Sequence, residues 1–158
     1  MSFVRNDLIG TGRPCPSILD YATSAKAHSV QNTPSVVSFF VLREILRWMQ
    51  GKGGLDYFED LSRKKAALIY DAVDASQGYY ISCVSPEYRS RMNVVFGLAA
   101  GAEAEKIFVH KAEHEHELVH LNGHRAVGHM RASLYNAITV EDVRRLVDFM
   151  GHYQSSHA

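Results

Sequence analysis

Cysteine, excess charge and long hydrophobic runs are all scarce in this sequence. Two cysteines among 158 residues provide no disulfide framework, which is typical of a reducing compartment. Seventeen basic residues balance seventeen acidic ones, so no net charge favours nucleic acid or an anionic membrane surface. The longest apolar run, Val36–Leu42, is interrupted by Ser38 and is too short to span a bilayer. The first residues show no signal-peptide pattern. We expect a cytoplasmic protein that binds neither nucleic acid nor membranes.

The residues that are present indicate one ordinary globular domain. Apolar residues make up 46% of the chain and charged residues 22%, a composition that can build a hydrophobic core. Periodicity predicts helices at 33–50, 55–75, 103–116 and 139–150, and strands at 79–84, 91–98, 118–121 and 130–136, with a strand end at 3–9. These strands are too close together for parallel crossovers. The pattern therefore predicts an α+β fold, with a small, mostly antiparallel sheet packed with helices.

Two helix starts are marked in the sequence. Thr33-Pro34 places a hydroxyl at an N-cap and proline at the first helical position. Thr139 followed three residues later by Asp142 is a variant of the capping box. We expect helices to begin at both points.

A histidine-rich segment offers one candidate for chemistry. Six of nine histidines lie between His110 and His129, and His116-Glu117-Leu-Val-His120 matches H-E-x-x-H, which is a zinc-hydrolase signature. That motif needs a helix through His120, whereas 118–121 is predicted as a strand. Four strand residues span roughly 13 Å, too far for two histidines to share one ion. A solvated helix end with no metal site is the favoured interpretation, and a zinc-dependent hydrolase is kept as an alternative.

A second candidate is the segment Gly123–Ser133, which has two arginines six residues apart. Arginine pairs bidentately with carboxylate or phosphate, so Arg125 and Arg131 suit two anionic groups of one small molecule, with His124 beside the first. Asn32 and Thr33 lie at a predicted helix N-terminus, whose free N–H groups and dipole suit a phosphate. Together, these features suggest a phosphorylated cofactor and an acidic substrate.

Several stretches resemble the phosphoserine aminotransferase family, in the same order and at similar spacings along most of the chain. The stretches that carry this resemblance are 28–34, 53–55, 88–94, 123–133, 135–137 and 146–150. The family consists of homodimeric pyridoxal-phosphate enzymes of fold type I, with active sites at the subunit interface. They exchange an amino group between phosphoserine and 2-oxoglutarate in serine biosynthesis.

The resemblance implies a role for each site residue. His124 and Arg125 would hold the substrate's phosphate or distal carboxylate, and Arg131 would hold its α-carboxylate. Asn32 and Thr33 would reach the cofactor phosphate of the partner subunit. Residues 1–34 would be a remnant of the large cofactor domain with its connection, and residues 35–158 the C-terminal small domain.

The sequence also departs from the family. Ala126 and His129 replace serine and glycine, and His129 puts a bulky side chain between the two arginines. None of the six lysines stands where the family's Schiff-base lysine does, so no catalytic residue is assigned and we expect the chain alone to be inactive. A non-catalytic partner of a complete aminotransferase subunit is a further alternative.

Overall fold

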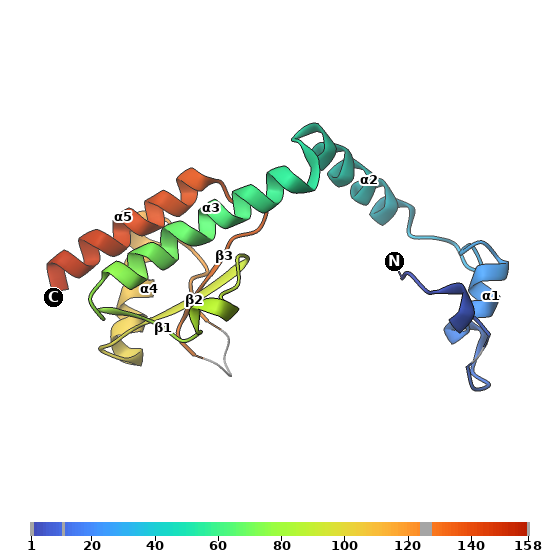
Figure 1. Ribbon diagram of the computed structural model, residues 1–158, viewed down its shortest axis with the longest axis horizontal. Helices are drawn as coiled ribbons and strands as arrows, with labels where there is room; N and C mark the ends of the chain where they lie inside the picture. The colour runs from blue at the N-terminus through green and yellow to red at the C-terminus, as the bar shows by residue number, and fades with distance from the viewer. Residues whose placement is uncertain (1, 11, 124–127, 158) are drawn as a thin grey trace. The chain divides into compact units, whose positions relative to one another are not determined.

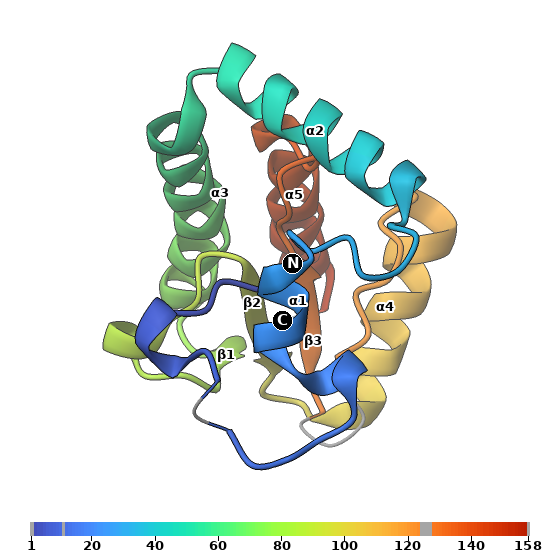
Figure 2. The same ribbon diagram turned by 90° about the vertical axis from the view of Figure 1, so that its right-hand side faces the viewer.

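A computed structural model describes residues 2–10, 12–123 and 128–157 (Figures 1 and 2). The chain divides into two compact units, Met1–Trp48 and Met49–Ala158, and the division falls inside helix α2 (Val36–Gly51). Each unit is described by itself. The expected domain boundary between residues 34 and 35 rests on the family resemblance and stays a prediction.

The first unit holds two short 3-10 helices, Asn6–Leu8 and Ser17–Leu19, then α1 (Tyr21–Lys26) and most of α2. Asp20 caps α1, because its carboxylate accepts hydrogen bonds from the N–H groups of Ala22 and Thr23 at 3.0 and 3.1 Å. None of the described residues of this unit is buried. The strand end expected at 3–9 is wrong, since a strand needs a hydrogen-bonded neighbour and the described part of this unit contains no strand.

Helix α2 begins two residues later than the Thr33-Pro34 pattern predicts. Its first residue is Val36, and the carbonyl of Ser35 accepts the first helical hydrogen bond, from Phe39 N–H at 3.1 Å. Ser35 therefore occupies the N-cap position, with its hydroxyl 2.8 Å from that of Ser38. The helix starts later than predicted because Ser35, the hydroxyl residue after Pro34, takes the N-cap position in place of Thr33.

The second unit is an α+β domain, as predicted. Its elements are α3 (Gly54–Ala75), β1 (Tyr80–Ser82), a 3-10 turn (Pro86–Tyr88), β2 (Asn93–Leu98), α4 (Ala102–His116), β3 (Met130–Ser133) and α5 (Val140–His157). The strands form one antiparallel sheet in the order β1-β2-β3. No helix in the described ranges is long and apolar enough to cross a membrane.

One face of this sheet is packed against helices. Figure 1 shows α3 and α5 side by side along the sheet. Phe108 of α4 is fully buried and contacts the rings of Tyr80, Phe96, Phe149 and Tyr153, with centroids 4.8–6.3 Å apart. Apolar side chains of all three helices and all three strands thus share one core.

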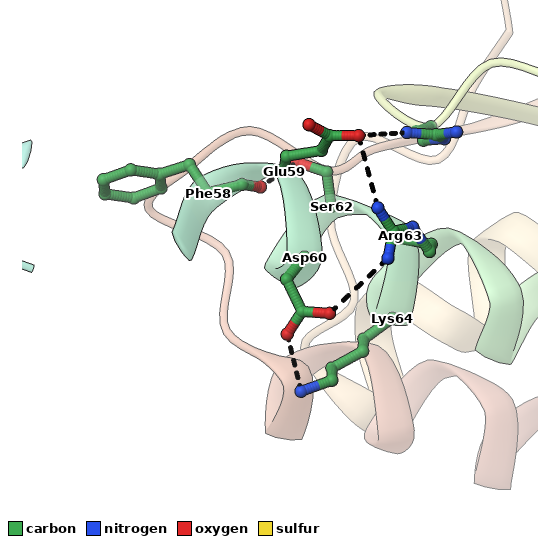
Figure 3. Close-up of polar contacts among 7 residues, drawn as sticks. Phe58, Glu59, Asp60, Ser62, Arg63 and Lys64 are labelled. Carbon is green, nitrogen blue, oxygen red and sulfur yellow. Dashed lines mark hydrogen bonds and ion pairs between the residues drawn. The ribbon is translucent and has the colours of Figure 1, made fainter. Parts of the chain in front are cut away.

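Side chains cap the start of α5 and form exposed ion pairs in the first half of α3. Thr139 and Asp142 bond reciprocally: Asp142 accepts from Thr139 N–H at 2.8 Å, and Thr139 Oγ1 accepts from Asp142 N–H at 3.1 Å. The predicted capping box is therefore confirmed. At the start of α3, Glu59 pairs with Arg63 at 3.2 Å and with Arg91, before β2, at 3.1 Å (Figure 3).

The strand expected at 118–121 is wrong as a separate element. Glu117 and His120 have positive φ angles of 58° and 63°, which interrupt extended backbone on both sides of the segment. The chain still runs beside β3, because Leu121 O accepts from Arg131 N–H at 2.8 Å and Asn122 bridges Met130.

Candidate functional site

The candidate site lies along strand β3. Along β3, Met130 and Ala132 are buried in the core, whereas Arg131 and Ser133 alternate with them and are half-buried. Ser133 Oγ donates to Oδ1 of Asn93 at 3.1 Å, which shows that Asn93 shares this face. Register pairs Asn93 with Ser133 and Val95 with Arg131. The second face thus presents polar groups to whatever approaches the sheet.

Arg131 is the charged residue of this row. Its Nε atom is buried and has no hydrogen-bond partner among the described residues. The residue also lines a cavity of about 510 Å³, together with residues of 117–121, 134–138 and the start of α5. The Nε atom of Arg89 is likewise buried without a partner among the described residues, so the distinguishing feature of Arg131 is its position beside the cavity, where a guanidinium can pair with an anion.

His129 stands two residues before Arg131 in a strained conformation. Its φ is 59°, which disfavours a side chain by about 1 kcal/mol relative to glycine. Nδ1 lies 2.9 Å from Oε1 of Glu105, and that same oxygen accepts from Leu98 N–H at 3.1 Å. A Cβ at Gly97 would lie 2.5 Å from Nδ1 and 2.7 Å from Oε1, so only glycine leaves room for the pair.

Lys65 of α3 fixes the turn that follows β3. Its side chain is fully buried, and Nζ donates to the carbonyls of Leu134, Tyr135 and Ile138 at 2.8–2.9 Å. Burial lowers the pKa of Lys65, and the carboxylate of Asp142 opposes that shift. All three ammonium protons are used, so this lysine is a structural group that is unavailable to a cofactor.

Arg89, in the stretch 88–94, is structural as well. Its guanidinium bonds both oxygens of Asp74 at 2.6 Å and lies 4.6 Å from the centre of the Tyr70 ring. The hydrogen bonds from Arg89 hold the pKa of Asp74 below its usual value. This contact anchors the segment before β2 to α3.

The other predicted site residues are less completely placed. His124 and Arg125, with Ala126, lie outside the described residues. Asn32 and Thr33 are exposed in the segment that leads to α2, in the first unit, whereas Arg131 belongs to the second. The structure therefore describes Arg131 beside a cavity of the second unit, and Asn32 and Thr33 at exposed positions of the first.

The zinc-hydrolase alternative lacks its geometry. Helix α4 ends at His116, and Glu117 is left-handed, so His120 does not follow one helical turn later. Across the described residues, no three histidine, cysteine, aspartate or glutamate side chains are grouped as metal ligands. The interpretation of residues 116–120 as a zinc-binding H-E-x-x-H motif is wrong, because the helix ends at His116, the first residue of the motif.

The described residues suit only part of pyridoxal phosphate, the cofactor that the resemblance implies. Asn32 and Thr33 are exposed polar residues before the N-terminus of α2, a setting that suits a phosphate. Lys65 is engaged with three carbonyls. The phosphate role of Asn32 and Thr33 stays a prediction, and Lys65 is not free to hold the cofactor.

Sequence reasoning missed Glu105, Gly97 and Lys65. Glu105 lies in the first turn of α4, where acidic residues are common for dipole reasons alone, so its bond to His129 left no separate signal. Gly97 interrupts a strand, a known sign of close approach that could have been noticed. Lys65 falls between apolar positions of α3, and only the fold shows that it is buried.

Comparison with known proteins connects this geometry to a family. Residues 4–146 match the model of the class-V aminotransferases. Phosphoserine aminotransferase of Niallia circulans is 44% identical over 97% of this chain, and that of Shouchella clausii is 43% identical over 90%. The chain spans 42% and 39% of these two relatives, about two fifths of their length.

Solved structures agree with the sequence relatives. Phosphoserine aminotransferase from Bacillus circulans subsp. alkalophilus superposes with a TM-score of 0.91 at 44% identity, covering 98% of this chain and 43% of that one. The pyridoxal-phosphate-bound enzyme from Trichomonas vaginalis gives 0.79 at 34% identity, covering 87% and 39%. This chain belongs to the class-V aminotransferase family.

Proposed function

We propose that this chain is the C-terminal part of a phosphoserine aminotransferase. The whole protein would transfer an amino group between phosphoserine and 2-oxoglutarate with pyridoxal phosphate, in serine biosynthesis. The observation that carries the proposal is 44% identity over 97% of the chain to a relative of that name, joined to a TM-score of 0.91. The free, exposed Cys15 and Cys83 are consistent with a cytoplasmic location.

Each part of the chain has a role in this proposal. Arg131, which lines the cavity along β3, would bind the α-carboxylate of the substrate. His124 and Arg125 would bind the phosphate or the distal carboxylate, while Asn32 and Thr33 would contact the cofactor phosphate across a homodimer interface. Pyridoxal phosphate, when bound, supplies the electron sink for the transfer.

Catalysis would depend on residues that these 158 do not contain. A transaminase needs a lysine that holds and releases the cofactor. Lys65 cannot serve, because its ammonium group is enclosed by three carbonyls. The chain would therefore bind substrate groups in the complete enzyme and would be inactive alone.

Phosphoserine transamination in a joined protein tests the proposal. The chain is fused to the portion of the Niallia circulans relative that it does not match, and both the fusion and the chain alone are assayed. We expect activity in the fusion only, with kcat/KM lowered about a hundredfold by Arg131→Gln, the effect of losing a bidentate charged contact.

Arg144→Gln is the matched control, because Arg144 is an exposed arginine of α5 paired with Glu141 at 3.2 Å. It should leave kcat/KM unchanged. A folded fusion without phosphoserine transamination, or equal losses in the two variants, would refute the proposed function.

A further inference from the structure

The turn between β3 and α5 forms part of the cavity that Arg131 lines. Leu134, Tyr135 and Ile138 of this turn line the same cavity of about 510 Å³. The backbone carbonyls of these three residues accept hydrogen bonds from Nζ of Lys65 at 2.8–2.9 Å. Lys65 is not among the described residues that line the cavity, so it holds this wall from outside.

Backbone hydrogen bonds accompany those of Lys65. Leu134 N–H donates to Met92 O at 2.7 Å, and Ile138 N–H donates to Tyr135 O at 2.9 Å within the turn. Lys65 adds three hydrogen bonds that join the turn to α3, which lies about 70 positions earlier in the sequence. The conformation of this cavity wall therefore depends on a residue far from it in the chain.

A fully buried lysine is a costly way to gain stability alone. Burying an ammonium group costs free energy that an apolar side chain of similar size avoids. The ammonium group of Lys65 provides three donors at one point, which fix three carbonyls relative to one another. What this residue supplies, and an apolar one would not, is a single conformation of the turn.

A second wall of the cavity interacts with the same lysine. Asp142, at the start of α5, lines the cavity, and its carboxylate attracts the ammonium group of Lys65. The wall formed by residues 117–121 is held differently, because Leu121 O accepts from Arg131 N–H at 2.8 Å. The cavity is thus lined by one segment bonded to β3 and by two that interact with Lys65.

We propose that Lys65 is a positioning residue for substrate binding, because it fixes the turn 134–138 that lines the cavity together with Arg131. This inference rests on the proposed function, since it takes this cavity to be where Arg131 binds the substrate's carboxylate. Lys65 itself does not touch the substrate. It keeps the cavity in the conformation that admits the substrate.

The expected effect follows from the population of that conformation. A turn released from Lys65 adopts the binding conformation for only part of the time, and the apparent Kd rises in inverse proportion to that fraction. If the fraction falls to about a tenth, Kd rises about tenfold. Such a loss weakens ground-state and transition-state binding alike, so in a complete enzyme it raises KM and leaves kcat unchanged.

Nuclear magnetic resonance on the 158-residue chain, with 2-oxoglutarate as the probe, tests the proposal. The signals followed are the Arg131 Nε–H and the backbone amides of Tyr135 and Ile138. In the wild type, we expect all of them to shift with one common Kd. Lys65→Met should raise that Kd about tenfold. Lys65→Gln, which keeps two donors, should have a smaller effect.

A matched control separates positioning from stability. Val73 is buried in α3, about 12 Å from Lys65 along the helix at 1.5 Å per residue. Val73→Ala should lower the urea midpoint by opening a cavity in the core, yet leave Kd unchanged. A merely structural role for Lys65 predicts that Lys65→Met behaves in the same way.

Chemical rescue adds a second readout. Lys65→Cys is unfolded, alkylated with bromoethylamine and refolded, which restores an ammonium group at nearly the reach of lysine. The alkylated variant should recover the wild-type Kd, whereas the variant without alkylation should not. The wild type treated identically is the control, because Cys15 and Cys83 react as well.

The outcomes distinguish this inference from the function on which it rests. If Arg131 responds to 2-oxoglutarate but Lys65→Met binds as tightly as Val73→Ala, the positioning role of Lys65 is refuted and the role of Arg131 stands. If Arg131 does not respond in the wild type, the substrate role of Arg131 fails and the inference fails with it.

Discussion

The two units of this chain use their apolar residues in opposite ways. In residues 49–158, side chains from three helices and three strands enclose Phe108, which has no exposed surface. In residues 1–48, no described residue is buried, although α2 carries Phe39 and Phe40, 55% and 58% exposed. Hydrophobic residues alone therefore do not make a core: they need partners from several elements.

This difference indicates which unit can be stable by itself. A helix of 16 residues in water is marginal when nothing packs on its apolar face. Exposed apolar surface on this scale also favours binding to another polypeptide. The alternative role as a non-catalytic partner of a complete aminotransferase subunit stays a prediction.

Hydrogen exchange should show the largest contrast between the units. Amides of β2 and of the centres of α3 and α5 should exchange only by global unfolding, with opening free energies of about 5 kcal/mol or more. Amides of α2 should open with about 1 kcal/mol or less, because little tertiary packing protects them. Equal protection from hydrogen exchange in α2 and α3 would show that α2 is packed against other residues in solution. That result would contradict the contrast between the two units.

Two phenylalanine truncations probe the same contrast through stability. Phe108→Ala should lower the free energy of unfolding by about 4 kcal/mol, because it opens a cavity among four aromatic rings. Phe39→Ala, at an exposed site, should change it by less than about 0.5 kcal/mol. Urea unfolding followed by far-ultraviolet circular dichroism measures both, and similar losses would contradict the division.

Adjacent lysines of α3 provide a finer test. Lys65→Met should destabilise the second unit by about 2 kcal/mol, because three buried carbonyls lose their donor while the cost of burying a charge is removed. Lys64→Met is the matched control: Lys64 is exposed and pairs with Asp60 at 2.7 Å (Figure 3). It should change stability by less than about 0.5 kcal/mol. If the two variants unfold at the same urea concentration, Lys65 is not a structural clamp.

Much of the second unit could be predicted from the sequence, because its elements follow local rules. Periodicity predicted α3, α4 and β2 nearly to the residue, and Thr139 with Asp142 marked the start of α5. The errors occurred where a conformation depends on single φ angles or on distant strands, as at 118–121 and 3–9. The Thr33-Pro34 pattern predicted that α2 starts at Pro34, whereas Ser35 caps the helix and Val36 is its first residue.

The charged residue that the sequence singled out on strand β3 is Arg131, whereas Glu105 and Lys65 are charged as well and were missed. Arg131 stood out through its residue type and spacing, and the structure places it on the polar face with an unpaired nitrogen. The bond between His129 and Glu105 joins residues 24 positions apart, and no local pattern encodes it. Lys65 likewise reaches carbonyls about 70 residues away. Such contacts depend on tertiary packing and cannot be obtained from spacing.

The smallest expected effect concerns the two helix caps. Thr139→Ala should lower the free energy of unfolding by about 1 kcal/mol at neutral pH. Ser35 caps the exposed α2, so Ser35→Ala should leave the stability of the second unit unchanged. Hydrogen bonds from Thr139 lower the pKa of Asp142 below its usual value. A carboxyl group whose pKa is lower in the folded protein than in the unfolded protein stabilises the fold at pH values above its unfolded pKa. This stabilisation is lost as the pH falls through the folded pKa. The difference between the urea midpoints of wild type and Thr139→Ala should therefore shrink as the pH falls from about 7 to about 2, without vanishing, because the bond from Asp142 N–H to Thr139 Oγ1 does not depend on the carboxylate charge. A difference that persists undiminished at pH 2 would show that the Asp142 carboxylate is not part of the cap.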